Sequence, residues 1–176
     1  MYLGIIILSV VAILFLFAVI HNVRNPPRVI QFDELPDDVI ADLKMHFSEF
    51  QSAEVRFFPA VRKYKMKGSY KDQQVAIEVE MTKSGLIDEL EFNDTDNKSS
   101  IRKAIIKDID EIPELILKLA FSQLTQSSET PQFVRACHVQ FSHEAGYKLE
   151  LAQLGYHYEF EITESGRLIE FEKERS

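Results

Sequence analysis

Cysteine and tryptophan are almost absent from this sequence. Of its 176 residues one is cysteine, Cys137, and none is tryptophan. A single cysteine excludes an intramolecular disulfide framework and a cysteine-based zinc site. Because apolar residues alternate around Cys137, we expect a buried and inert thiol rather than a nucleophile.

Positive charge is in short supply as well. Lysine and arginine number 20 against 28 aspartates and glutamates, and the formal net charge is −8. Proteins that bind nucleic acid neutralise its phosphates with clustered lysine and arginine. The sequence therefore predicts no nucleic-acid partner, and a basic protein or peptide is the more compatible charged partner.

The motifs of common catalytic and cofactor sites are missing from the sequence. It contains no glycine-rich phosphate loop, no nucleophile elbow and no helix with a zinc-binding pair of histidines. His138, His143 and His157 are the histidines to weigh as metal ligands, but a zinc site would normally add a carboxylate or a thiolate. His46 is expected at the surface of a helix. We predict no enzyme activity, no cofactor and no metal.

One long apolar run stands near the start of the chain. No charged residue occurs from Tyr2 to Ile20, and a helix of that length crosses the hydrocarbon core of a bilayer, about 30 Å. A cleaved signal peptide would have a basic start and a small-residue cleavage site, and neither is evident. We therefore predict an uncleaved transmembrane anchor over residues 1–21, with the lipid bilayer as a partner, and a proline-containing spacer over residues 22–30.

The charges that flank this run indicate an orientation. Arg24 and Arg28 follow it, and no basic residue precedes it. Basic flanking residues favour the cytoplasmic side of a membrane. The sequence thus predicts a single-pass membrane protein with its soluble domain in the cytoplasm, and a periplasmic or extracellular domain is the alternative.

Two stretches further along are near copies of each other. Residues 77–85 read IEVEMTKSG, and residues 158–166 read YEFEITESG. In each, apolar residues alternate with glutamate and lead into Ser-Gly, which is the pattern of a half-buried strand entering a tight hairpin. We expect an internal repeat built around this hairpin.

The first copy belongs to a predicted unit over residues 31–92. Pro36, Asp37 and Asp38 suit the first turn of a helix, whose apolar residues then recur at helical spacing. The apolar period changes to two afterwards, which predicts four strands at residues 53–58, 61–69, 75–81 and 86–92.

A polar linker over residues 93–100 separates this unit from a second, over residues 101–176. We expect a short helix from Ile101 to Ile109, and then a helix after Pro113 that is apolar on most sides and buried against both the sheet and another helix. Four strands should follow, at residues 133–141, 146–151, 156–163 and 167–172.

These patterns predict an α+β fold. It consists of an N-terminal transmembrane helix and two helix-then-four-strand antiparallel meander repeats, which form one sheet with the helices packed on one face.

Each unit resembles a PepSY-like repeat, in which a proline-started helix precedes a meander. The residues that carry the resemblance are Ile77-Glu78-Val79 with Ser84-Gly85, and Tyr158-Glu159-Phe160 with Ser165-Gly166. Tandem copies are similar to the β-lactamase-inhibitor-protein-like fold. The resemblance covers nearly all of the chain after residue 30. It implies that the concave sheet face binds a protein and that the protein inhibits or modulates an extracytoplasmic enzyme.

The two units differ in outward charge. In the first, Lys63, Lys65 and Lys67 should lie on the strand beside Glu78 and Glu80 and form a charge ladder. The second has no such lysine row, so its glutamates are less compensated. An acidic patch there is the predicted partner-binding site, with simple solubility as the alternative. Its members are Glu150, His157, Glu159, Glu161 and Glu170.

Three functions stay open on the sequence. The preferred one is a membrane-anchored, non-catalytic protein-interaction or regulatory module that uses its exposed sheet face. A small-ligand or metal-binding envelope domain is the second. The third is a structural subunit of a membrane complex, in which the anchor helix makes the contacts.

Overall fold

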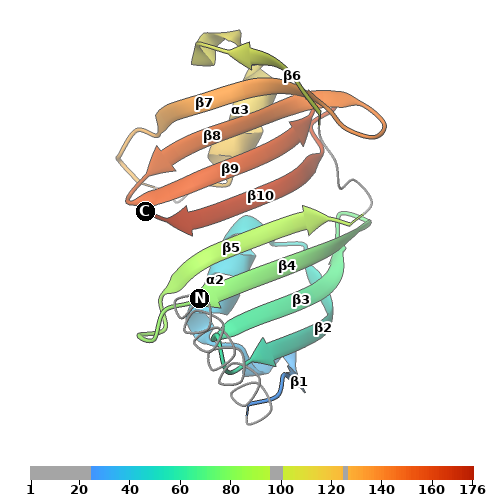
Figure 1. Cartoon of the computed structure of the whole chain (residues 1–176), viewed down its shortest axis with the longest axis vertical. Coiled ribbons are helices and arrows are strands. Elements are labelled where there is room, and N and C mark those ends of the chain that lie inside the picture. Colours follow the sequence, from blue (N-terminus) through green and yellow to red (C-terminus); the bar gives the residue numbers. More distant parts are fainter. Residues whose placement is uncertain (1–24, 96–100, 125–126) are drawn as a thin grey trace, which may run out of the picture.

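The structure, a computed structural model, describes residues 25–95, 101–124 and 127–176. Ten strands in these ranges form one antiparallel sheet, in the spatial order β1-β2-β3-β4-β5-β10-β9-β8-β7-β6. β5 and β10, which are far apart in sequence, pair with each other in the middle of the sheet. The edge strands are β1 and β6 (Figure 1). The strands are β1 (Arg28–Ile30), β2 (Gln51–Phe58), β3 (Lys63–Tyr70), β4 (Gln73–Met81), β5 (Ile87–Asp94), β6 (Ile101–Ile106), β7 (Gln132–Gln140), β8 (Ala145–Gln153), β9 (Tyr156–Thr163) and β10 (Leu168–Arg175).

Within residues 25–95, 101–124 and 127–176, helical structure is limited to a few turns. These ranges contain two α-helices, α2 (Asp37–His46) and α3 (Glu114–Ser122), each preceded by a 3₁₀ turn, η1 (Phe32–Glu34) or η2 (Ile109–Glu111). Both α-helices lie behind the sheet in Figure 1, so they cover one sheet face, and no described helix covers the other, which we call the open face.

The predicted fold class is wrong. The regular structure of the described residues is mostly β, and a strand precedes each helix where the prediction had a spacer or a helix. β1 occupies the end of the predicted spacer and pairs with β2, while β6 replaces the helix expected from Ile101 to Ile109 and pairs with β7. The units are therefore not helix-then-four-strand repeats, although their strands do form a single sheet, as the prediction had it. The apolar residues of 101–106 had matched a helical period by chance.

The prediction of a single-pass membrane protein is likewise not supported. Among the described residues, no helix is long and apolar enough to cross a bilayer. Residues 2–20, on which the anchor and the orientation were predicted, lie outside the described residues.

The core lies between the covered sheet face and the two helices. Along the strands between the two edges, alternate side chains point into it, because strand side chains alternate between faces. Phe47, directly after α2, stacks on Phe92 of β5 with ring centroids 4.8 Å apart, and meets Phe171 of β10 edge-on at 5.5 Å. One continuous apolar cluster therefore crosses the junction of β5 and β10.

The two predicted hairpins are present, and their turns have matching hydrogen bonds. Gly85 and Gly166 have φ of +91° and +88°, values that glycine adopts without a steric penalty. The amide of Gly85 donates to the carbonyl of Thr82, and the amide of Gly166 donates to the carbonyl of Thr163. These turns join β4 to β5 and β9 to β10, so they place the outward glutamates of the four central strands.

Two local predictions about burial need correction, and one is confirmed. His46 is not at the surface: it is only 2% exposed and packs against Phe171. α3 is not buried on most sides, because Leu115 and Phe121 are exposed to solvent. Cys137 is buried, as expected.

Candidate functional site: an acidic row on the open sheet face

The open face is lined by glutamates from five adjacent strands. On β4, β5, β9 and β10 the inward positions are mostly apolar, apart from Asp94 and Lys173, and many of the outward ones are glutamate, so each strand contributes carboxylates to the same side. The sheet register aligns one glutamate from each strand directly opposite the next. The resulting glutamate row consists of Glu78, Glu91, Glu172, Glu159 and Glu150.

The row spans the centre of the molecule. Neighbouring strands are about 4.8 Å apart, so its five carboxylates extend over about 19 Å. Lys65 lies opposite Glu78 at one end, and Arg135 lies opposite Glu150 at the other. The row is thus negative in the middle and bounded by a cation at each end.

Lysines neutralise the β4 end of the row. Lys63 Nζ lies 2.7 Å from carboxylate oxygens of both Glu78 and Glu80, and Lys65 also pairs with Glu78. Burial opposes the effect, but the hydrogen bonds from the two lysines lower the pKa of Glu78. The predicted charge ladder is confirmed for these residues, whereas Lys67 lies opposite Ala76.

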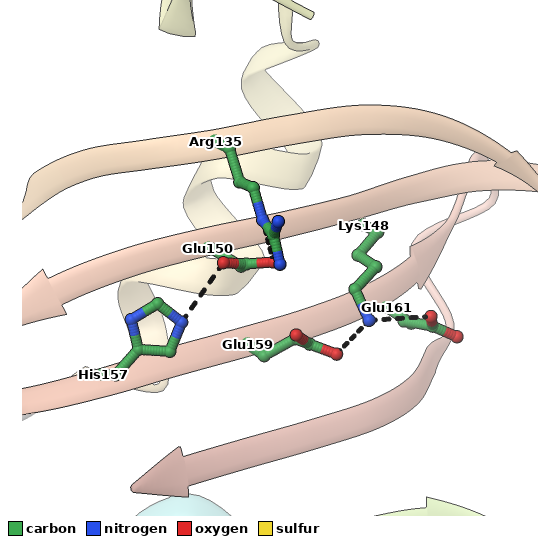
Figure 2. A network of polar contacts seen from close by, with 6 residues as sticks. All are labelled: Arg135, Lys148, Glu150, His157, Glu159 and Glu161. Atoms are coloured by element: carbon green, nitrogen blue, oxygen red, sulfur yellow. Dashed lines mark hydrogen bonds and ion pairs between the residues drawn. The ribbon is translucent and has the colours of Figure 1, made fainter. Parts of the chain in front are cut away.

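A second group of basic side chains contacts the carboxylates at the β8 end (Figure 2). Arg135 donates to Glu150 Oε1, and His157 Nε2 lies 3.3 Å from the other oxygen of Glu150. Lys148 pairs with Glu159 and lies 3.6 Å from Glu161. Glu150 and Glu161 are 4% and 5% exposed, so these two carboxylates are covered rather than freely presented.

All five residues of the predicted patch lie on one face of three adjacent strands. Glu159 is opposite Glu150, and Glu161 is opposite Glu170, while His157 contacts Glu150. The prediction of their proximity therefore agrees with the structure, but whether they bind a partner stays a prediction. His138 is engaged elsewhere, since its Nε2 pairs with Glu164 at 3.0 Å.

The glutamates at the centre of the open face have the fewest nearby cations. In the part of the chain that the structure describes, no cation lies within ion-pair distance of five glutamates on β5 and β10. Glu91 lies opposite Glu172, and Glu89 lies opposite Glu174. We call this set the seam glutamates; it consists of Glu89, Glu91, Glu170, Glu172 and Glu174.

Proton affinities reflect this crowding. Burial, with the charges of Glu161 and Glu159 added, raises the pKa of Glu170 to about 7. Burial also raises the pKa of Glu172, and the charge of Glu159 adds to that increase. The pKa of Glu89 is raised mainly by burial as well. These carboxylates are held in an environment that disfavours their charged form.

Sequence reasoning missed Glu89, Glu91, Glu172 and Glu174 as members of the site. Their alternation with apolar residues was readable, and it does place them outward. The pairing of β5 with β10, which brings the two sets of glutamates together, could not be predicted from the order of the strands along the chain.

Three of the carboxylates are close enough to share a metal ion. Oxygens of Glu159, Glu161 and Glu170 lie within 4.8 Å of one another. The ammonium group of Lys148, however, already contacts two of the three. The described group contains no histidine, so a harder cation such as Ca²⁺ would suit it better than zinc.

Comparison with known proteins adds little to this geometry. No family model matches the chain, and no curated protein matches it. The chain is similar to a solved structure, a DUF2874 family protein from Bacteroides uniformis ATCC 8492, at 15% identity over 77% of this chain and 86% of that chain, with a TM-score of 0.29. A TM-score this low does not establish a shared fold, and the resemblance to PepSY-like repeats stays a prediction.

Proposed function

We propose that this chain is a non-catalytic protein-interaction module, of regulatory or inhibitor-like type, whose open sheet face binds a basic segment of a protein partner. The observation that carries the proposal is the glutamate row, whose central members Glu91 and Glu172 lie opposite each other with no ion pair to a described residue. Like charges directly opposite on a sheet destabilise it. A partner that brings lysine or arginine to this place would remove that repulsion on binding.

The dimensions of the row define the partner further. Its span of about 19 Å corresponds to between three and four turns of an α-helix at about 5.4 Å per turn. A helix with basic residues on one face, laid across the strands, would match the row. Association would be steered by charge, so its rate and affinity should fall as salt is added.

Charge reversal at the centre of the row tests the proposal. The double variant Glu91→Lys/Glu172→Lys should keep the fold and raise its stability at low salt, yet abolish partner binding. The matched control is Glu49→Lys/Glu129→Lys, which changes the net charge equally at exposed positions away from the open face. The readout is photocrosslinking from Ala152 on the open face, with Ser48 beside α2 as the helix-side reference, followed by mass spectrometry of the captured protein.

The outcomes separate cleanly. The proposal requires one protein captured from Ala152 but not from Ser48, lost in the central double variant and retained in the control. Capture that survives the central charge reversal would remove the open face as the binding site. A captured protein without a basic segment would contradict the charge argument.

A second candidate is a cation-binding domain, favoured by the proximity of Glu159, Glu161 and Glu170. Titration with Ca²⁺ or Zn²⁺, followed by thermal unfolding, distinguishes it from the first. A metal that binds only the native state raises the unfolding temperature, and the increase grows with the logarithm of the metal concentration above its Kd. Stabilisation that disappears in Glu170→Gln would favour this candidate, and an unchanged unfolding temperature would exclude it.

A further inference from the structure

A hollow lies on the open face beside the β8 end of the glutamate row. It has a volume of about 170 Å³, and its walls come from β6, β7 and β8. In the sheet register, Cys137 of β7 lies between Ile105 of β6 and Lys148 of β8. The cysteine side chain is shorter than both neighbours, so a hollow remains between them. The surface proposed to bind a partner therefore continues past Glu150 onto the next two strands.

The lining of the hollow combines apolar and basic side chains. Cys137 and Ile105 supply apolar surface, and Ile105 is 71% exposed. The basic members of the lining are Arg102, Arg135 and Lys148. A protein cavity of about 150 Å³ holds a molecule the size of benzene, so the hollow has room for one side chain of a partner.

Two of the three basic side chains already have carboxylate partners. Arg135 pairs with Glu150, and Lys148 pairs with Glu159 (Figure 2). Among the described residues, no carboxylate lies within ion-pair distance of Arg102, whose side chain is exposed. The hollow thus keeps one cation that is available to an anionic group of a partner.

The lysines at the opposite end of the open face are better compensated. Lys63 and Lys65 both form ion pairs with Glu78. Lys67 lies directly opposite Glu54 on β2. The unpaired arginine of the hollow, by contrast, lies opposite an apolar valine of β7. The two ends of the open face are therefore not equivalent for a bound helix.

From this hollow and its unpaired cation, we propose that the basic helix bound by the open face carries one glutamate a turn beyond its basic residues, and that this side chain fills the hollow. Its methylene groups would lie against Cys137 and Ile105, and its carboxylate would pair with Arg102. Strands are about 4.8 Å apart and a helical turn rises about 5.4 Å, so a residue one turn beyond Glu150 lies over β7. The inference rests on the proposed function and adds an orientation: the acidic end of the helix lies over β7 and β6.

An acidic residue in the helix would act against the overall charge of the protein. The formal net charge is −8, so an added negative charge should weaken the binding of a basic peptide at other positions. A gain in affinity from glutamate is consequently a specific sign of contact with Arg102.

The test measures the binding of three fluorescent helical peptides to the 176-residue chain by anisotropy at low salt. Each peptide has lysines on one face over about 19 Å, the span of the glutamate row. The parent has glutamine one turn beyond each end of its lysines, and each of the other two has glutamate in place of one of these glutamines. One glutamate peptide should bind about 2- to 5-fold more tightly than the parent, as expected for an ion pair at an exposed site. The other should bind more weakly.

Two variants attribute the gain to the hollow. In Arg102→Gln the gain from glutamate should be lost, and in Arg102→Glu the favoured glutamate peptide should bind more weakly than the parent. Lys67→Gln removes a cation from the open face of β3 and is the matched control, in which the gain should be unchanged. Arg102 is exposed on an edge strand, so these substitutions should leave the fold intact.

The peptides also distinguish this inference from the proposed function. If the parent peptide binds and loses affinity in Glu91→Lys/Glu172→Lys, the proposed charge match is supported. Equal or weaker binding of both glutamate peptides, or a gain that persists in Arg102→Gln, would then overturn only the acidic residue in the hollow. A parent peptide that fails to bind, or whose binding ignores the central charge reversal, would contradict the basic helix and this inference with it.

Discussion

Single residues that hold charge or potential charge inside the fold set its dependence on pH. His46 is buried beside Phe171, while the ammonium group of Lys173 lies 2.8 Å from Asp42 Oδ2 and 4.7 Å from the ring centre of Tyr156. Burial lowers the pKa of His46 from 6.5 to about 4; Asp42 opposes this change and Lys173 adds to it. His46 is therefore neutral in the folded protein at neutral pH.

We expect His46 to destabilise the fold as the pH falls. Between pH 6.5 and 4 the unfolded chain binds a proton at this position that the folded chain does not, so stability decreases as the pH falls through that window. The loss attributable to His46 between pH 8 and pH 5 should be about 2 kcal/mol. Urea unfolding of the wild type and His46→Leu at both pH values measures it.

Only the difference between the two proteins reports on His46. Glu170 acts in the opposite direction, because its raised pKa of about 7 makes the fold more stable as the pH falls from 7 towards 4.5. The wild type should consequently show a shallow pH dependence, and His46→Leu should gain stability on acidification. Parallel pH profiles for the two proteins would show that His46 is not neutral and buried in solution.

At the scale of elements, the junction of β5 and β10 combines an apolar face with a repulsive one. Phe92 lies opposite Phe171, and its neighbour Glu91 lies opposite Glu172. The phenylalanines point into the core, whereas the glutamates point to the open face. Packing on one side therefore holds together strands whose charges on the other side repel.

Neutralising one seam glutamate should stabilise the protein. Glu172→Gln removes like-charge contacts with Glu91 and Glu159, each of which lies directly opposite. The expected gain in unfolding free energy is about 0.2–1 kcal/mol per contact at low salt, and it should shrink at about 1 M salt, where the Debye length is about 3 Å. Urea unfolding at both salt concentrations measures the gain.

Glu49→Gln, at an exposed position after α2, is the control and should have no such effect. A destabilising effect of Glu172→Gln, or a gain that salt does not change, would contradict the repulsive arrangement.

Local apolar–polar patterns predicted several strands, but they did not predict structure that depends on contacts with distant parts of the chain. The strand over residues 156–163 was predicted at its observed bounds, because alternation of apolar and polar residues is a local property. β6 was missed, because its few apolar residues fit a helix, and its strand form depends on pairing with β7, about 30 residues later. The burial of His46 likewise depends on contacts with residues far along the chain.

On the scale of the whole molecule, one core joins all parts of the sheet. Phe47 contacts Tyr70, Phe92 and Phe171, which belong to β3, β5 and β10. The ion pair between Lys173 and Asp42 also connects β10 to α2. The structure therefore predicts that both sides of the β5–β10 junction unfold together.

Phe47→Ala should lower the unfolding free energy by about 3–5 kcal/mol, the usual cost of removing a buried phenylalanine. Unfolding should remain a single transition, with coincident curves from far-ultraviolet circular dichroism and tyrosine fluorescence. Phe121→Ala on the exposed side of α3 is the matched control and should cost far less. Two separate transitions in either variant would mean that the two sides of the sheet are independent.

The same strand order dictates when the sheet can be completed during synthesis. β5 pairs with β4 soon after it is made, but its other edge has no partner strand until residue 175 has emerged from the ribosome. An unpaired edge of this kind is a template for aggregation, and outward charges are one protection against it. Glu89 and Glu91 lie on that unpaired edge of β5, so their charges would disfavour aggregation of the nascent chain. In the completed sheet the same two residues lie opposite Glu174 and Glu172 of β10.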